Sequence, residues 1–356
     1  MSLDPGPADH GDRRKSAAPA RRSGYRATVT TPSAIGLPPG YRTRDLTLDD
    51  VPAVTALLAA WERAEPDDHG YTETEIREEF TAPVAAMDGG GAVVLHQDRL
   101  VAYGLLHVIA REPNWLAYAD GGVHPDVHRQ GVGGWMLQRQ LELARALRDE
   151  QAPGVPGELR VGVAEARPGA LAAVTAAGFE PRRYFFRMRT DLRGPAPDPL
   201  PDPPGIRIRR FESTDEDAVR LASNDSFADH WGSVPRDPDS WRAEHLGSVA
   251  FRAESSFVAQ DVTGIVGFVL AAERDADTAS RGHRTGYVSR VGTVRAARGR
   301  GVGSALVARS LAAMQAAGYA EAELDVDAES PTGAGRLYER LGFTVSARDR
   351  LYSRLL

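Results

Sequence analysis

The fold is decided by the stretch Val291-Gly292-Thr293-Val294-Arg295-Ala296-Ala297-Arg298-Gly299-Arg300-Gly301-Val302-Gly303-Ser304-Ala305-Leu306. It reads as an apolar strand, then a turn of arginine and glycine, then the first turn of an amphipathic helix. A helix start presents backbone N–H groups that have no partner within the helix, together with the positive end of the helix dipole. Such a start suits a pyrophosphate, so the stretch predicts a phosphate-binding turn at residues 298–304.

A weaker copy lies in the first half of the chain, at Val123-His124-Pro125-Asp126-Val127-His128-Arg129-Gln130-Gly131-Val132-Gly133-Gly134. In each half we expect a strand and a helix, a hairpin, the glycine turn with its helix, a further strand, and a second helix that ends at Gly-Phe. The turn glycine and that phenylalanine are 48 residues apart in the first half (Gly131, Phe179) and 42 in the second (Gly301, Phe343). This repetition predicts a duplicated α+β unit.

Proline-rich segments divide the chain of 356 residues. Residues 1–38 are rich in Pro, Gly, Ser, Ala and charge without a hydrophobic period, which predicts a disordered tail. Residues 192–205 form a linker that is too rich in proline to join a core. We therefore expect an N-terminal domain over residues 39–191 and a C-terminal domain over residues 206–356.

The composition excludes several kinds of chemistry. The chain has no cysteine, which rules out disulfides, thiolate metal sites and a cysteinyl acyl intermediate. Its net charge of −6 argues against a general nucleic-acid-binding protein. The longest apolar runs are far too short to span a bilayer, and we find no export signal. We expect a cytoplasmic monomer or homodimer with no nucleic-acid or membrane partner.

A second motif follows the turn, at Leu337-Tyr338-Glu339-Arg340-Leu341-Gly342-Phe343. Together with the turn Arg298-Gly299-Arg300-Gly301-Val302-Gly303, this motif resembles the GCN5-related N-acetyltransferase (GNAT) superfamily. The tandem layout is similar to that of two-domain acetyltransferases of the mycothiol synthase type. The resemblance implies an α+β (α/β) fold of two tandem GNAT-like domains, each with a mixed, mostly antiparallel central sheet flanked by helices. It also implies direct transfer of an acetyl group from acetyl-CoA to a primary amine of a small molecule.

The resemblance places the pyrophosphate of acetyl-CoA on the turn and its pantetheine arm on the preceding strand. The expected contacts in the second half are Val291, Gly292, Thr293, Val294, Arg298, Gly299, Arg300, Gly301, Val302, Gly303, Ser304 and Ser330. In the first half they are Val123, Arg129, Gly131, Gly133 and Gly134. We expect no metal, because His124 and His128 flank a proline and no third ligand is evident.

Tyr338 is the first candidate for catalysis. The thiolate that leaves a thioester must gain a proton, and a phenol of pKa about 10 can supply one to a thiol of pKa about 8.5. Many relatives use a glutamate on the strand before the turn as general base, but residues 286–291 contain no carboxylate. We therefore take Asp229 and His230 as candidate bases. The alternatives are Asp325, Asp327, Glu329 and a water relay.

The first half departs from the pattern. His128 stands in place of Arg298, and Val174, which cannot donate a proton, stands in place of Tyr338. Asp120, near this turn, is expected to be a solvated residue at the end of a strand. We therefore expect a degenerate N-terminal domain, which binds acetyl-CoA without turnover or supports the acceptor site, and a catalytic C-terminal domain.

The acceptor is the least determined part of the prediction. Asp225, Asp229 and Asp327, around the expected cleft, suit a cationic amine such as an aminoglycoside, a polyamine or an amino sugar. The alternative to an enzyme is a non-catalytic sensor that binds acyl-CoA. A sensor fits both the missing base and the departures of the first half.

Overall fold

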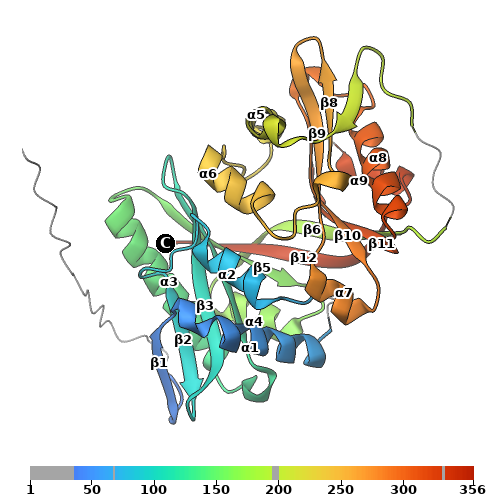
Figure 1. Ribbon diagram of the computed structural model, residues 1–356. Coiled ribbons are helices and arrows are strands. Elements are labelled where there is room, and N and C mark those ends of the chain that lie inside the picture. Colours follow the sequence, from blue (N-terminus) through green and yellow to red (C-terminus); the bar gives the residue numbers. More distant parts are fainter. Residues whose placement is uncertain (1–35, 67–68, 195–199, 331–332) are drawn as a thin grey trace, which may run out of the picture. The chain divides into compact units, whose positions relative to one another are not determined.

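The computed structural model describes residues 36–66, 69–194, 200–330 and 333–356 (Figure 1). Residues 1–35 of the predicted tail and residues 195–199 of the predicted linker lie outside these ranges. The domain limits drawn from the sequence therefore stay a prediction.

Strands and helices follow one another in the same order in the two halves, except that the second half has an additional helix between its third and fourth strands. The first half contains β1 (Tyr41–Asp45), α1 (Val51–Ala64), α2 (Glu73–Thr81), β2 (Gly91–His96), β3 (Arg99–Ala110), β4 (Trp115–Val123), α3 (Val132–Gln151), β5 (Gly157–Ala164), α4 (Pro168–Ala176) and β6 (Glu180–Asp191). The second half contains β7 (Arg207–Arg210), α5 (Glu216–Phe227), α6 (Pro238–Trp241), β8 (Phe257–Asp261), β9 (Gly264–Ala272), α7 (Asp275–Arg281), β10 (Thr285–Thr293), α8 (Val302–Ala316), β11 (Glu321–Asp327), α9 (Ala334–Arg340) and β12 (Thr344–Leu355). A helix follows each glycine turn, as predicted.

All twelve of these strands form one continuous sheet in the order β1-β2-β3-β4-β5-β12-β6-β11-β10-β9-β8-β7. The described pairings are antiparallel except for β4 with β5 and β10 with β11. A mixed, mostly antiparallel sheet flanked by helices in each half confirms the predicted fold class.

The two halves exchange their last strands. β6 comes from the first half but pairs with β11 and β12, and β12 comes from the second half but pairs with β5 (Figure 1). The sequence did not predict this exchange, because β6 and β12 are both twelve-residue strands that follow a Gly-Phe helix end. Local patterns of this kind do not specify which sheet a strand joins.

One ion pair shows how closely the halves repeat each other. Arg44 donates to both carboxylate oxygens of Asp50, at 2.7 and 2.6 Å. Arg209 holds Asp215 in the same way, at 2.6 and 2.7 Å. Each pair joins the first strand of its half to the short 3₁₀ turn that begins the next helix. A fork of two charge-assisted bonds fixes this entry angle.

Alternate residues of the strands supply separate cores on the two faces of the sheet. In β2, Ala92 packs in the core that contains α3, whereas Val93 packs in the core of α1 and α2. In β8, Ala259 packs against α8 and α9, whereas Val258 packs against α5 and α6. The candidate site in the second half thus has α8 and α9 on one face and α5 and α6 on the other.

None of the helices in the described ranges combines the length and the apolar character that crossing a bilayer requires.

Candidate active site

The strands β10 and β11 separate after a short stretch of pairing. Their parallel ladder covers only Thr285–Tyr287 of β10, although β10 stays paired with β9 as far as Thr293. The β10 ladder also carries an irregularity between Val288 and Arg290. Within the described residues, no strand pairs with the β11-facing edge of β10 beyond Tyr287. Backbone donors and acceptors are therefore available there to an extended ligand.

A cleft of about 880 Å³ opens at this separation. Of the twelve acetyl-CoA contacts predicted in the second half, those that line it are Val291, Gly292, Thr293, Arg298, Gly299, Gly301, Val302, Gly303, Ser304 and Ser330. Tyr338 and His230 line it as well. The structure does not place Val294 or Arg300 in the lining. Val294 packs in the apolar core, and Arg300 donates to the carbonyl of Pro204 at 2.9 Å.

The glycine turn has the geometry of a phosphate-binding loop. Gly299 and Gly301 have φ values of +75° and +83°, which L-residues with side chains rarely adopt. Gly301 is the N-cap of α8 and has no side chain to cap the first turn of that helix. The N–H groups of the next three residues are therefore free of intrahelical partners. A pyrophosphate fits these donors.

The guanidinium of Arg298 is already hydrogen-bonded to other residues of the protein. Its guanidinium donates to both oxygens of Asp229, at 2.6 and 3.0 Å, and to the carbonyl of Ser226 at 2.8 Å. This pairing lowers the pKa of Asp229 to about 2. A carboxylate of such low pKa is a weak base, so the arrangement disfavours the predicted role of Asp229 in catalysis. Its observed contact instead joins the end of α5 to the glycine turn.

Tyr338 lies on α9 and is buried, with its ring 5.9 Å from that of Phe343 in an edge-on arrangement. Burial raises the pKa of Tyr338 to about 12. The phenol therefore stays protonated at neutral pH, which is the state that a proton donor needs.

His230 is the predicted base that the structure places in the cleft. Its ring lies 4.8 Å from that of Phe227, and burial lowers the pKa of His230 below its ordinary value. The imidazole is therefore neutral at pH 7 and able to accept a proton. Among the alternatives, Asp325 lines the cleft and accepts a hydrogen bond from Tyr287 at 2.5 Å.

The prediction of a cationic acceptor depends on three aspartates whose partners the structure shows. Asp225 accepts from the backbone N–H of Arg295 at 2.9 Å, and Asp229 is paired with Arg298. Arg183 forms ion pairs with both Asp327 and Glu329. The acidic side chains that suggested a cationic ligand are thus already bonded within the protein.

Comparison with known proteins agrees with this geometry. The model described as the acetyltransferase (GNAT) family matches the chain twice, over residues 54–178 and over residues 217–343. The chain belongs to the GNAT family. It is an acetyl-CoA-dependent acetyltransferase with two GNAT units in tandem.

The chain is similar to curated acetyltransferases and to solved GNAT structures. Mycothiol acetyltransferase from Parafrankia sp. is 32% identical over 331 residues, which cover 87% of this chain and 97% of the relative. Its counterpart from Frankia alni is 30% identical over 331 residues, covering 86% and 92%. A GNAT protein from Sphaerobacter thermophilus has a crystal structure that matches with a TM-score of 0.70 at 27% identity, covering 90% of this chain and 97% of that one. A tandem GNAT protein from the clavulanic acid biosynthesis pathway shares the fold, with a TM-score of 0.67 at 18% identity and coverage of 88% and 98%.

The GNAT turn of the first half is held by local hydrogen bonds. Arg129 has a φ of +59° where the second half has a glycine, and the neighbouring Gln130 accepts from Tyr41 at 2.6 Å. A ring nitrogen of His128 lies 3.0 Å from the carbonyl oxygen of Val123. Gly131 remains the N-cap of α3 with a φ of +87°, and Gly133 and Gly134 lie in the first turn of that helix. The described contacts do not decide whether this turn also binds acetyl-CoA, which stays a prediction.

Asp120 lies in an acidic cluster rather than at a solvated strand end. It accepts from Tyr103 at 3.0 Å and is hydrogen-bonded to Glu79. Burial and the charge of Asp120 together raise the pKa of Glu79 to about 8, so Glu79 is mostly protonated at neutral pH. Asp120 lies opposite Leu105 in the sheet, as Arg290 lies opposite Leu270. The two halves of this GNAT protein thus have opposite charges at equivalent positions.

The sequence suggested that the first half could support the acceptor site, but it did not identify the residues that contribute to the cleft. Phe185, on the exchanged strand β6, lines the cleft. Trp231 lines it from the α5–α6 loop, and its ring lies 3.9 Å from the guanidinium carbon of Arg160 on β5. Arg160 is held in turn by Glu158 and Tyr118. Only the spatial exchange of strands brings these residues together.

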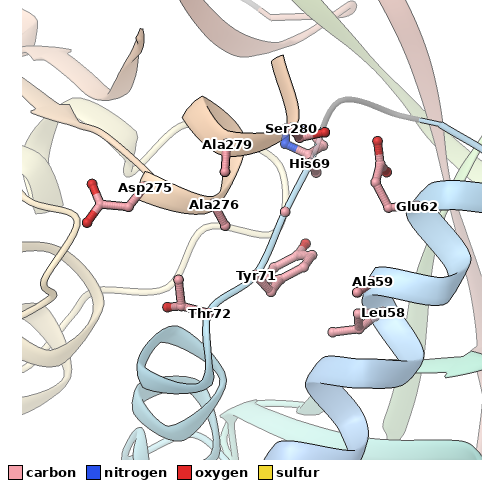
Figure 2. A pocket seen from close by; sticks show the side chains of 11 residues that line it. Leu58, Ala59, Glu62, His69, Tyr71, Thr72, Asp275, Ala276, Ala279 and Ser280 are labelled. Atoms are coloured by element: carbon pink, nitrogen blue, oxygen red, sulfur yellow. The ribbon is translucent and has the colours of Figure 1, made fainter. Parts of the chain in front are cut away.

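A second cavity, of about 400 Å³, lies between the halves of this GNAT chain (Figure 2). The ring of Tyr71 lies between Ala59 on α1 and Ala276 on α7, and a ring nitrogen of His69 lies 3.6 Å from Asp277. Neither glycine turn contributes to the lining, which is mainly apolar. In the part of the chain that the structure describes, no group of three or more His, Cys, Asp or Glu residues is arranged to hold a metal ion.

Proposed function

We propose that this enzyme transfers the acetyl group of acetyl-CoA directly to a primary amine of a small molecule, and that the second half is the catalytic one. One observation carries the proposal. The open edge of β10, the glycine turn and the buried phenol of Tyr338 line a single cleft. At the position equivalent to Tyr338, the first half has the buried Val174, which offers no proton.

Acetyl-CoA supplies the activated acetyl group. The unpaired backbone groups of β10, from Val291 to Thr293, would hold its extended arm. The N–H groups at the start of α8 would hold its phosphates. Gly303 lets α8 and α9 pack closely beside these groups, because a Cβ there would lie 3.2 Å from the side chain of Leu337.

Tyr338 would act as the proton donor. As the amine nitrogen bonds to the acetyl carbon, the carbon–sulfur bond breaks and the sulfur takes the phenolic proton. The amine must lose a proton in the same reaction, because an alkylammonium has no free electron pair. His230 is neutral and lies in the cleft, so we assign this proton to His230, directly or through water. The second proton that the amine nitrogen loses restores the phenol of Tyr338, and His230 releases its proton to the solvent, which leaves the amide and the thiol of CoA as products.

The acceptor is the finer part of the proposal. Mycothiol acetyltransferases cover nearly the whole chain, so their acceptor is the first to test. The chain departs from many GNAT proteins in having no carboxylate over residues 286–291 of β10. This departure leaves room for a different amine.

The experiment is a steady-state assay of thiol release by the full chain with acetyl-CoA. The acceptor panel includes the mycothiol precursor, amino acids and their amides, amino sugars and diamines, and a reaction without acceptor measures hydrolysis. We expect amine-dependent release with at least one acceptor, and mass spectrometry should show an N-acetyl product. Tight binding of acetyl-CoA without release on any amine would contradict the proposal and favour a sensor.

A further inference from the structure

Arg290 lies on β10, directly beyond the strand irregularity, and lines the catalytic cleft. Its Nε donates to the hydroxyl of the buried Ser223 at 2.8 Å. The guanidinium carbon lies 4.1 Å from the centre of the Phe227 ring and 5.9 Å from that of Trp241. These contacts from α5 and α6 fix the guanidinium on the α5–α6 face of the sheet, next to the loop that carries His230.

Arg290 forms no ion pair with any described carboxylate. The charged groups that face it are Arg236 and Glu244, and Glu244 already accepts from Arg236 at 2.8 Å. His245 adds no negative charge, because burial lowers its pKa to about 3 and it is neutral at pH 7. The group of Arg290, Arg236 and Glu244 therefore has a net charge of about +1 by formal count at neutral pH.

Arg290 is a buried cation that makes no direct ion pair, and the charge of Glu244 offsets only part of the cost of its burial. Burial lowers the pKa of Arg290 to about 10, which shows the cost, yet the group stays charged at neutral pH. Ser223 accepts a hydrogen bond only from the Nε of Arg290. The two terminal nitrogens of the Arg290 guanidinium make no hydrogen bond to a described residue. Two parallel N–H groups match the two oxygens of one carboxylate.

We propose that Arg290 binds a carboxylate of the acceptor, so that the substrate is an amine that also carries a carboxylate group. The inference rests on the proposed function, since it places the acceptor in the same cleft. It assigns Arg290 to substrate selection and leaves proton transfer to Tyr338 and His230.

The first test compares matched acceptors in the thiol-release assay: amino acids and the amides of the same amino acids. The native enzyme should favour the free carboxylate by at least about tenfold in kcat/KM. Arg290→Met should lower kcat/KM for the carboxylate form by about ten- to one-hundredfold, the range expected for hydrogen bonds to a charged group, and leave the amide little changed.

Two variants control for charge and folding. Arg242→Met removes a positive charge from the segment after α6, where Arg242 is largely exposed and paired with Glu216, and should leave the preference unchanged. Arg290→Lys keeps the charge but loses the fork, and should recover part of the preference. Unchanged affinity of Arg290→Met for acetyl-CoA would show that the variant is folded.

The second test does not require turnover. Calorimetry on the CoA-saturated enzyme measures binding of N-acetyl amino acids and their amides, which resemble the product. The carboxylate forms should bind at least about tenfold more tightly, and Arg290→Met should abolish the difference. Equal binding of both forms, binding of neither, or an Arg290→Met defect confined to the KM of acetyl-CoA would overturn the inference. Failure of thiol release with every amine, with selective carboxylate binding intact, would overturn only the proposed function.

Discussion

The two halves of the molecule share a scaffold and differ in chemistry. Both hold the entry to their first helix with a forked Arg–Asp pair, and both begin the helix after the turn with a glycine of positive φ. The last four residue pairs before each turn also have the same register, from Leu105–Asp120 to Ala102–Val123 in the first half and from Leu270–Arg290 to Gly267–Thr293 in the second. These features are structural requirements of the fold, and duplication has preserved them in both copies.

Three of the positions at which the copies differ bear directly on the chemistry of the cleft. Gly299 corresponds to Arg129, Tyr338 to Val174, and Arg290 to Asp120. In this order, the differences change how closely the backbone can approach a phosphate, whether a side chain can donate a proton, and whether the site attracts an anion. The comparison teaches that a glycine turn alone marks the fold, whereas the residues around it mark the reaction.

Removal of the phenolic hydroxyl of Tyr338 should have the largest effect on activity. We expect Tyr338→Phe to lower kcat by about 100-fold, the lower end for loss of a general acid, with little change in the KM of acetyl-CoA. Val174→Ala, at the equivalent position of the first half, should leave kcat within about twofold once both proteins are compared below their unfolding temperatures. An unchanged kcat in Tyr338→Phe would remove the phenol from the chemistry.

A pair of glycine substitutions should show which turn binds the donor. Gly301→Ala and Gly131→Ala impose similar strain, because both glycines have φ values above +80°. We expect Gly301→Ala to raise the KM of acetyl-CoA by about tenfold, since the strain displaces N–H groups that meet the phosphates. Gly131→Ala should leave that KM unchanged. An equal rise in both would mean that the first half also contributes to binding of the donor.

The two Arg–Asp pairs should be equally important for stability. Asp50→Asn and Asp215→Asn each weaken a forked bond to arginine, so we expect a loss of about 1–3 kcal/mol in the free energy of unfolding for either variant. The arginine partner lowers the pKa of both aspartates, so this stability is present above their unfolded pKa and is lost as the pH falls through the folded value. Denaturant melts at pH 7 and pH 3 measure both effects. A loss of stability in only one of the two variants would contradict the expectation that both pairs are equally important.

The acidic cluster of the first half should affect the pH dependence of stability and leave catalysis unchanged. Glu79 keeps its proton in the folded state up to about pH 8, whereas the unfolded chain releases it near pH 4.5. Stability therefore falls as the pH rises between these values. Glu79→Gln should reduce this fall by a few degrees in Tm between pH 5 and pH 8. The exposed Glu73 on the same helix offers the control Glu73→Gln, and an identical pH profile in both variants would contradict the assignment.

Local patterns were enough to predict the turn and its helix. The run of glycines fixes where α8 begins, and the motif around Tyr338 fixes a second helix at the right distance, so the phenol in the cleft followed. Contacts between residues far apart in the sequence could not be predicted in this way. The pairing of Arg298 with Asp229 spans 69 residues, and the cluster around Arg290 joins three separate elements. Such contacts depend on how helices are set on the sheet, which composition and spacing do not encode.

The exchanged strands β6 and β12 make each half depend structurally on the other. β6 fills the place between β11 and β12, so a second half expressed from residue 206 onward would lack an interior strand of its own sheet. The first half would likewise lack β12 beside β5. Neither copy can therefore be discarded on its own, because its last strand is a structural part of the other half. This interlocking gives a physical reason for both copies to persist, whatever their separate shares in the chemistry.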